Sequence, residues 1–286
     1  MTTYTIMHIP SIESLLKKYQ IRPKKYMGQN FLKAVPTLEK IVRLAEISKD
    51  DDVLEIGSGL GVMTALLADQ AHLVYAVEKD RAAAQIIQEE FGNLKNIQLI
   101  VDDFLKLDLQ QNLAQARTPL KVVGNIPYNI STPIIFKLIE NKNLIQQSIL
   151  TIQKEVANRI VAKPNCKDYG ILSIMLQVHA KCEKLFDVSP NSFIPPPKVT
   201  SSVIKIDFEN APNLEIKSMA SFENLVKAAF GQRRKTIKNA LTGSPKLKCN
   251  SSQVSELLKQ NNIKESLRPE QITIEEYIGL ANSLNF

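Results

Sequence analysis

The chain has 286 residues, a length that suits one large domain with a smaller one attached. Its hydrophobic fraction of 44% is ordinary for a globular protein, and no stretch approaches the ~18 consecutive apolar residues that a membrane helix requires. The net charge is +7, and three widely spaced cysteines exclude both a disulfide framework and a C-x-x-C metal site. Because no export signal is visible, we expect a cytoplasmic protein, and we expect no protein-bound metal.

Short apolar runs alternate with helix-like stretches through the first two thirds of the chain. The predicted strands are 53–56, 73–78, 97–101, 122–125 and 148–152, and a late strand at 199–208 is expected to close the sheet. Apolar strands separated by helices predict a doubly wound α/β fold with helices on both faces. In such a fold, ligands bind at the carboxyl ends of the strands.

The pattern changes after the last predicted strand. Pro212 lies in a linker, and from Ser218 onward the periodicity is helical. We therefore predict a large α/β domain at 1–209 and a small all-α domain at 210–286. From Lys227 to Lys248 there are seven Lys or Arg and no acid, which favours a polyanion such as nucleic acid over an ordinary solvated helix face.

A glycine-rich turn follows the first predicted strand, with Gly57, Gly59 and Gly61 preceding an apolar helix. A dinucleotide fingerprint would place its third glycine at Val62, which argues against a nicotinamide cofactor. A purely structural turn is the alternative. The E-x-G-x-G-x-G form resembles the first motif of class I methyltransferases, which implies a Rossmann-like mixed sheet and S-adenosylmethionine.

Two acids follow the next strands. Glu78 is placed to accept hydrogen bonds from ribose hydroxyls, although a solvated strand end is the simpler interpretation. Asp103 could accept from the adenine amino group of the cofactor, and Asp102 is an equally acidic competitor. The pattern of the class I methyltransferases, which the glycine loop resembles, favours Asp103.

The fourth strand runs into Asn125-Ile-Pro-Tyr128, which resembles the N-[LI]-P-[YF] motif of enzymes that methylate exocyclic amino groups. An adenine amino nitrogen is a poor nucleophile, so the site must hold its N–H groups with acceptors such as Asn125 and a backbone carbonyl beside Pro127. Tyr128 offers a face for an unstacked base, and Phe193 before three prolines is expected to clamp the other side. Alone, each motif would be an ordinary turn.

Five motifs together resemble the small-subunit ribosomal RNA adenine dimethyltransferases. They lie at 28–32, 55–61, 125–128, 193–198 and 230–241. The resemblance implies that Asn30 and Leu32 join Gly57, Gly59, Glu78, Asp103 and Asn125 around the cofactor, and that Asn125, Pro127, Tyr128 and Phe193 form the catalytic set. It also implies that 1–209 is the catalytic domain, that its segment 1–32 closes over the cofactor, and that 210–286 docks the RNA. The implied reaction is dimethylation of two adjacent adenines near the 3′ end of the RNA, with a role in subunit biogenesis. Arg233, Arg234, Lys235 and Lys238 are assigned to RNA docking.

Three alternatives remain open. A related class methylates large-subunit RNA and confers antibiotic resistance, and it shares the glycine loop and the Asn125 motif. DNA adenine methyltransferases usually carry Asp-Pro-Pro-Tyr instead. The third alternative is a protein that acts by binding, either a ribosome-assembly factor or a relative recruited to mitochondrial transcription. The expected partner is the small ribosomal subunit, and the protein is expected to be a monomer.

Overall fold

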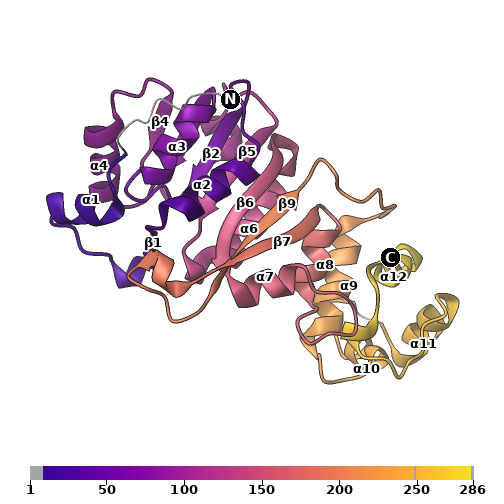
Figure 1. The fold of residues 1–286 in the computed structure, drawn as a ribbon. Helices are drawn as coiled ribbons and strands as arrows, with labels where there is room; N and C mark the ends of the chain where they lie inside the picture. The colour runs from indigo at the N-terminus through magenta and orange to yellow at the C-terminus, as the bar shows by residue number, and fades with distance from the viewer. Residues whose placement is uncertain (1–8, 248, 285–286) are drawn as a thin grey trace. The chain divides into compact units, whose positions relative to one another are not determined.

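The computed structural model describes residues 9–247 and 249–284, and the fold is built around a seven-stranded sheet (Figure 1). The strand order is β4-β3-β2-β5-β6-β9-β7. The strands are β2 (Asp52–Ile56), β3 (Leu73–Val77), β4 (Ile97–Ile100), β5 (Leu120–Asn125), β6 (Ile145–Gln153), β7 (Lys181–Val188) and β9 (Ser201–Asp207). A separate two-stranded pair joins β1 (Phe31–Leu32) to β8 (Phe193–Ile194).

The sheet is mixed, as predicted. Strands β2 to β6 pair in parallel, whereas β9 is antiparallel to β6, with Thr151 opposite Val203. All five residues of β2 are buried, which agrees with a central strand covered on both faces. All six strands predicted from the sequence are present, and the class I methyltransferase fold is confirmed.

Strand β7 was not predicted. It lies at the edge of the sheet, where only one neighbour pairs with it, and it carries Lys181, Glu183, Lys184 and Asp187 among its eight residues. Edge strands commonly carry charges, and these interrupt the apolar pattern on which strand prediction depends.

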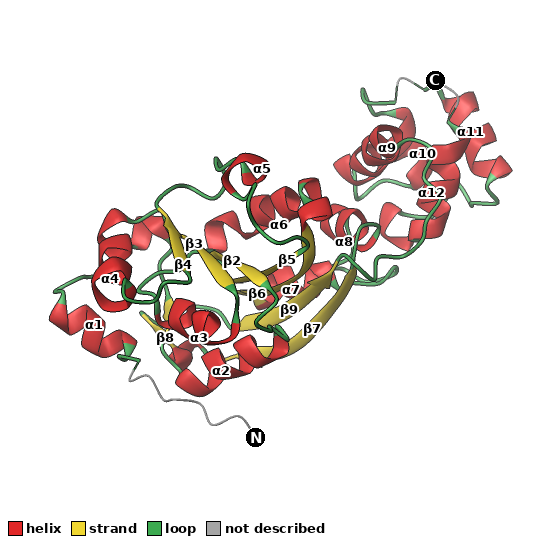
Figure 2. Cartoon of the chain, turned by 90° about the horizontal axis from the view of Figure 1, so that it is seen from above, coloured by secondary structure: helices red, strands yellow, loops and turns green. Residues whose placement is uncertain are grey.

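Helices cover both faces of the sheet, with α2 and α3 on one side and α6 on the other (Figure 2). The helices of the N-terminal part are α1 (Ile12–Lys18), α2 (Val35–Leu44), α3 (Val62–Gln70), α4 (Arg81–Phe91), α5 (Leu109–Asn112), α6 (Ser131–Glu140) and α7 (Lys154–Ile160). Those that follow are α8 (Ile171–Gln177), α9 (Met219–Gly231), α10 (Ile237–Thr242), α11 (Ser251–Gln260) and α12 (Ile274–Ser283). Five short 3-10 turns are η1 (Lys25–Met27), η2 (Tyr128–Ile130), η3 (Lys142–Leu144), η4 (Pro190–Ser192) and η5 (Pro269–Gln271).

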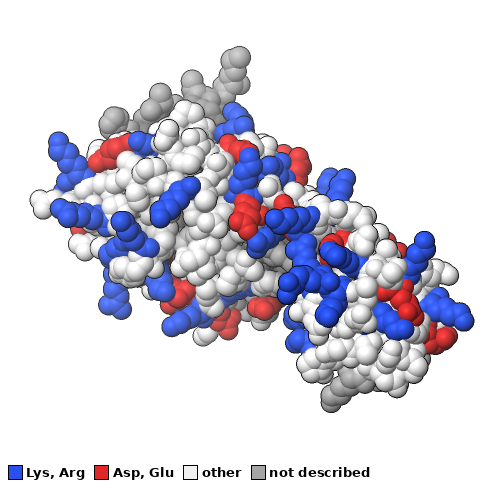
Figure 3. All heavy atoms as spheres, turned by 90° about the horizontal axis from the view of Figure 1, so that it is seen from below, with Lys and Arg blue, Asp and Glu red and all other residues white. Residues whose placement is uncertain are grey.

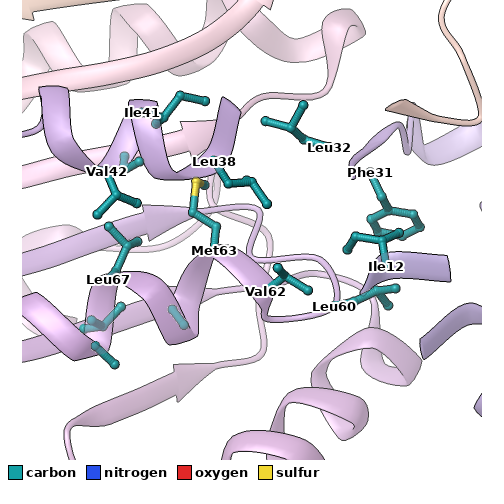
Figure 4. Packing of buried hydrophobic residues seen from close by; sticks show 14 of the residues in the cluster. Ile12, Phe31, Leu32, Leu38, Ile41, Val42, Leu60, Val62, Met63 and Leu67 are labelled. Carbon is teal, nitrogen blue, oxygen red and sulfur yellow. The ribbon is translucent and has the colours of Figure 1, made fainter. Parts of the chain in front are cut away.

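The largest described apolar cluster joins α2 and α3 to the sheet and to the N-terminal segment (Figure 4). Leu38 and Ile41 of α2 pack in it with Met63 and Leu67 of α3, and all four are buried. Phe31 belongs to the same cluster. Burying one such side chain contributes about 2 kcal/mol, so the segment that carries Phe31 is fixed to the domain that carries the glycine loop.

The chain divides into two compact units. The first unit comprises the described residues of Met1–Ala157 and Glu183–Glu209. The second comprises the described residues of Asn158–Cys182 and Asn210–Phe286. The predicted boundary at residue 210 coincides with one of the points where the chain passes from one unit to the other. Residues 158–182, however, group with the C-terminal helices. Sequence reasoning did not separate this segment, because its helix α8 continues the α/β alternation.

An aromatic cluster holds the second unit together. The ring of Phe230 lies 6.4 Å from that of Tyr169 and 6.2 Å from that of Tyr277, measured between centroids. The Tyr277 hydroxyl donates to the Pro269 carbonyl at 2.8 Å. Phe230, at the end of α9, therefore connects 158–182 to the C-terminal helix α12. Within the described ranges, no helix is long and apolar enough to cross a membrane.

Candidate active site

A cavity in the first unit lies at the carboxyl ends of β2, β3 and β5, as expected for a doubly wound sheet. It is bordered by the N-terminal segment, the glycine loop, the acids after β3 and β4, and the turn after β5. Eight of the predicted site residues line it: Asn30, Gly57, Gly59, Glu78, Asp103, Asn125, Pro127 and Tyr128. The fold thus brings together residues from five separate segments.

The glycine loop turns the chain sharply from β2 into α3. Gly57, Gly59 and Gly61 all have positive φ, at +73°, +58° and +83°, a region that other residues rarely occupy. A Cβ built on Gly57 would lie 3.8 Å from the Asn125 carbonyl oxygen and 4.0 Å from Pro127 Cδ. Because both neighbours line the cavity, a side chain at Gly57 would occupy space that a ligand needs.

Glu78 is held in place by the loop that it faces. Its carboxylate accepts from the Gly59 N–H at 2.7 Å and from the Asp80 N–H at 2.7 Å. It is only 8% exposed, and burial raises its pKa. A carboxylate has about four acceptor positions, and these backbone donors do not fill all of them, so Glu78 can still accept from a ribose hydroxyl.

Asp102 and Asp103 both line the cavity. Asp103 accepts from Lys79 Nζ at 2.8 Å and from the Leu105 N–H at 3.0 Å, and the hydrogen bond from Lys79 lowers its pKa. Asp102 in turn accepts from the Asp103 N–H at 2.6 Å. The preference for Asp103 as the adenine acceptor therefore stays a prediction, and Lys79 is a partner that sequence reasoning did not foresee.

Asn125 ends β5, and the N-terminal segment orients its side chain. Its amide nitrogen donates to the Asn30 carbonyl at 2.8 Å. Among the described residues the amide oxygen has no hydrogen-bond donor, so it is the atom left to accept from a substrate amine. The Pro127 carbonyl already accepts from the Ile130 N–H at 3.1 Å, which leaves the Ile126 carbonyl as the backbone acceptor beside Pro127.

Tyr128 is fixed through its hydroxyl. The hydroxyl forms a 2.5 Å hydrogen bond with Ser201 Oγ, and Ser201 is fully buried at the start of β9. Burial raises the pKa of Tyr128 above its usual value, and the hydrogen bond with Ser201 offsets only part of this rise. Ser201 was missed in the sequence. The only available signal was its position shortly after the proline-rich motif.

The Gly28-Gln-Asn motif docks the N-terminal segment onto this site. Gly28 has φ +68°, and a Cβ there would lie 2.8 Å from Asn129 Oδ1. Gln29 Nε2 donates to Asp80 Oδ2 at 2.9 Å, and Lys24 Nζ donates to Asp80 Oδ1 at 2.7 Å. Sequence reasoning identified the motif but not Asp80, which anchors it from the start of α4.

Two predicted site residues do not reach the cavity. Leu32 is 4% exposed and Phe193 is 1% exposed, and the two pair directly in the β1–β8 ladder. Both belong to the apolar cluster under α2. The two-stranded pairing turns these side chains into the core, so neither lines the cavity in this structure. The base-clamping role of Phe193 and the cofactor contact of Leu32 stay predictions.

The predicted RNA-docking residues lie in the second unit and differ in their partners. Arg233 donates to the Lys167 carbonyl and lies 3.9 Å from Glu270, and Lys238 forms an ion pair with Glu265 at 2.8 Å. Arg234 and Lys235 are exposed and form no ion pair within the described ranges. Lys248, the end of the basic run, lies outside the described residues.

Acidic and basic side chains are interspersed on the surface in Figure 3, so the charge there is not a single uninterrupted basic patch. Within the described part of the chain, no group of three or more His, Cys, Asp or Glu could hold a metal ion.

This sheet and glycine loop, with an acid after β3 and Asn125 at the end of β5, define a class I S-adenosylmethionine-dependent methyltransferase. Residues 21–285 match the family described as ribosomal RNA adenine dimethylase, and the chain belongs to that family. Ribosomal RNA small subunit methyltransferase A of Syntrophus aciditrophicus is 37% identical, with 96% of this chain and 99% of the relative covered. The protein of the same name from Alkaliphilus oremlandii is 42% identical, with 95% of each covered.

Solved structures agree with this assignment. A dimethyladenosine transferase from Plasmodium falciparum superposes with a TM-score of 0.75 at 25% identity, covering 87% of this chain and 95% of that one. The 23S rRNA methyltransferase ErmE superposes with a TM-score of 0.67 at 26% identity, covering 88% and 98%. The fold is thus shared with the large-subunit class as well.

Proposed function

We propose that this protein uses S-adenosylmethionine to dimethylate the exocyclic amino groups of two adjacent adenines near the 3′ end of small-subunit ribosomal RNA. The orientation of Asn125 carries the proposal, because its amide oxygen is the free acceptor at the end of β5. Relatives named as small-subunit methyltransferases, at 37% and 42% identity over nearly the whole chain, support the choice of RNA.

The residues of the cavity suit this cofactor. The absence of a Cβ at Gly57 leaves room beside the Asn125 carbonyl, and Glu78 retains acceptor positions for ribose hydroxyls. Gly57, Gly59 and Glu78, with Asp103 and Asn30, would hold it. When bound, S-adenosylmethionine supplies an electrophilic methyl group.

The protein's task is to position the amine. The lone pair of an adenine amino group is delocalised into the ring, so the nitrogen attacks only when it is held in line with the methyl group. Asn125 Oδ1 and the Ile126 carbonyl can each accept one N–H, and these fixed dipoles stabilise the positive charge that develops on nitrogen. Tyr128, anchored by Ser201, presents a ring on which the unstacked base can rest. After each transfer the positively charged nitrogen, which is strongly acidic, releases one proton to water, so the mechanism uses no titrating base.

Docking of the RNA is assigned to the second unit. Arg234 and Lys235 are exposed without an ion-pair partner in the described ranges, so both can neutralise phosphates at little cost. Arg233 and Lys238 would first have to release acidic partners. We propose the small ribosomal subunit as the partner, a monomer as the active form, a cytoplasmic location and a contribution to subunit biogenesis.

The test is transfer of labelled methyl groups to small subunits that lack this modification, with large subunits and naked DNA as parallel acceptors. We expect dimethyladenosine in the small-subunit RNA alone. Label in large-subunit RNA would transfer the assignment to the resistance class. Tight binding of small subunits without label would favour an assembly factor.

A further inference from the structure

Tyr26 is an aromatic side chain that the folded protein leaves in solvent at the cavity. It is 76% exposed and lines the cavity together with Tyr128. The other exposed large apolar residues among those described are Val35, Val101 and Val199, at 44% to 48%, and none of them lines the cavity. Isolated exposed apolar residues are common, but an exposed ring at the mouth of a ligand site is a candidate contact.

The turn that carries Tyr26 is fixed at both ends. The Met27 N–H donates to the Lys24 carbonyl at 3.0 Å, and the Gly28 N–H donates to the Lys25 carbonyl at 3.0 Å. Lys24 is bound to Asp80, as described above, and its N–H donates to Gln29 Oε1 at 2.8 Å. Because the backbone of the turn is already fixed, only the side-chain torsions of Tyr26 have to be ordered when the ring binds a ligand.

This turn also lies directly on the motif that receives the target base. The position where a Gly28 Cβ would be is 3.4 Å from Pro127 Cβ and 2.8 Å from Asn129 Oδ1. Tyr26 is two residues from Gly28, so it is held at the same rim as Pro127 and Tyr128. Lys25, its neighbour in the turn, is exposed and has no ion-pair partner in the described ranges.

We infer that Tyr26 and Lys25 form a second nucleotide subsite at the mouth of the cavity. Tyr26 stacks on the base next to the target adenine, and Lys25 contacts the phosphate between the two nucleotides. The inference rests on the proposed function, in which two adjacent adenines enter the site in turn. When one base is drawn into the cavity its neighbour loses a stacking partner, and an aromatic ring at the rim can replace that partner. An exposed cation beside a stacking ring is the usual composition of a single-strand binding surface.

The experiment measures methyl transfer to unmodified small subunits by the wild type, Tyr26→Ala, Tyr26→Phe and Lys25→Ala. Lys17→Ala serves as the matched control, because Lys17 is an exposed lysine of α1 that does not line the cavity. Stacking of one base on one ring corresponds to roughly a 5- to 150-fold change, so Tyr26→Ala should lower kcat/KM for the subunit within that range. Tyr26→Phe should retain most activity, Lys25→Ala should weaken the salt dependence, and Lys17→Ala should do neither.

Cofactor affinity, measured by calorimetry, separates a base contact from a cofactor contact. We expect the same affinity in Tyr26→Ala as in the wild type. An equal loss of cofactor affinity and of kcat/KM would show that Tyr26 contacts the cofactor and would overturn the subsite. Unchanged kcat/KM in Tyr26→Ala would also overturn the subsite. In that case the proposed function would still stand, provided that the wild-type protein methylates the small subunits in the same assay. A wild type that leaves small subunits unlabelled would overturn both.

Discussion

Replacing Gly57 with alanine tests whether the glycine loop is shaped for a ligand or only for a turn. The added Cβ would meet nothing closer than 3.8 Å in the protein, so it fits without a clash. It would, however, project beside the Asn125 carbonyl and Pro127 into the cavity. The variant should therefore fold, and its defect should appear in cofactor binding.

A second variant, Gly61→Ala, separates the loss of stability from the loss of cofactor affinity. Gly57 and Gly61 both have positive φ, so alanine at either position should cost about 1 kcal/mol of backbone strain. At Gly61 the Cβ would also lie 2.8 Å from the ring of Phe91, inside the core and away from the cavity. Gly61→Ala should thus lose more stability than Gly57→Ala, because overpacking adds roughly 1 to 3 kcal/mol.

The assay combines calorimetric titration of S-adenosylmethionine with thermal unfolding of both variants. Gly57→Ala should bind the cofactor at least about tenfold more weakly, a loss of ~1.4 kcal/mol, while keeping most of its stability. Gly61→Ala should show the reverse order, with the larger loss in melting temperature. Wild-type cofactor affinity in Gly57→Ala would refute the claim that this loop borders the cofactor.

Three further predictions address pH, positioning and RNA docking. Burial raises the pKa of Glu55 to about 7, so the folded state retains a proton that the unfolded chain releases near pH 4.5. The free energy of unfolding should fall by roughly 3 kcal/mol as the pH rises from 4.5 to 7. Glu55→Gln should remove this fall, as measured by denaturant titrations at several pH values. The same pH dependence in Glu55→Gln as in the wild type would contradict the prediction. Ser201→Ala should lower kcat about three- to tenfold through Tyr128, consistent with one lost hydrogen bond, and should add nothing in a Tyr128→Phe background; additive losses would show that the two act separately. Neutralising Arg234 and Lys235 together should reduce the salt slope of RNA binding by up to about 2, and an identical slope would place the docking surface elsewhere.

The central sheet could be predicted because its strands are buried on both faces. Residues 53–56 are apolar except for Glu55, and this pattern is visible in the sequence alone. The edge strand β7 escaped prediction for the opposite reason, since its charges face solvent. The glycine loop was predictable because its positive φ angles favour glycine, and the three glycines are visible in the sequence.

Contacts between distant segments could not be predicted. The Ser201–Tyr128 hydrogen bond joins residues 73 apart, and the Asn30–Asn125 bond joins residues 95 apart. Both depend on how the strands are arranged in the sheet, and no local sequence pattern predicts that arrangement. The burial of Phe193 depends on the same kind of long-range contact, because its antiparallel pairing with Leu32 turns the ring into the core.

The most direct test of the account is Asn125→Ala, measured both for cofactor binding and for methyl transfer to unmodified small subunits. Because the Asn125 amide oxygen is assigned to the substrate amine, we predict that single-turnover transfer falls by about 10² to 10³, while cofactor affinity changes less than tenfold. Transfer at the wild-type rate would contradict the claim that this asparagine positions the adenine amino group.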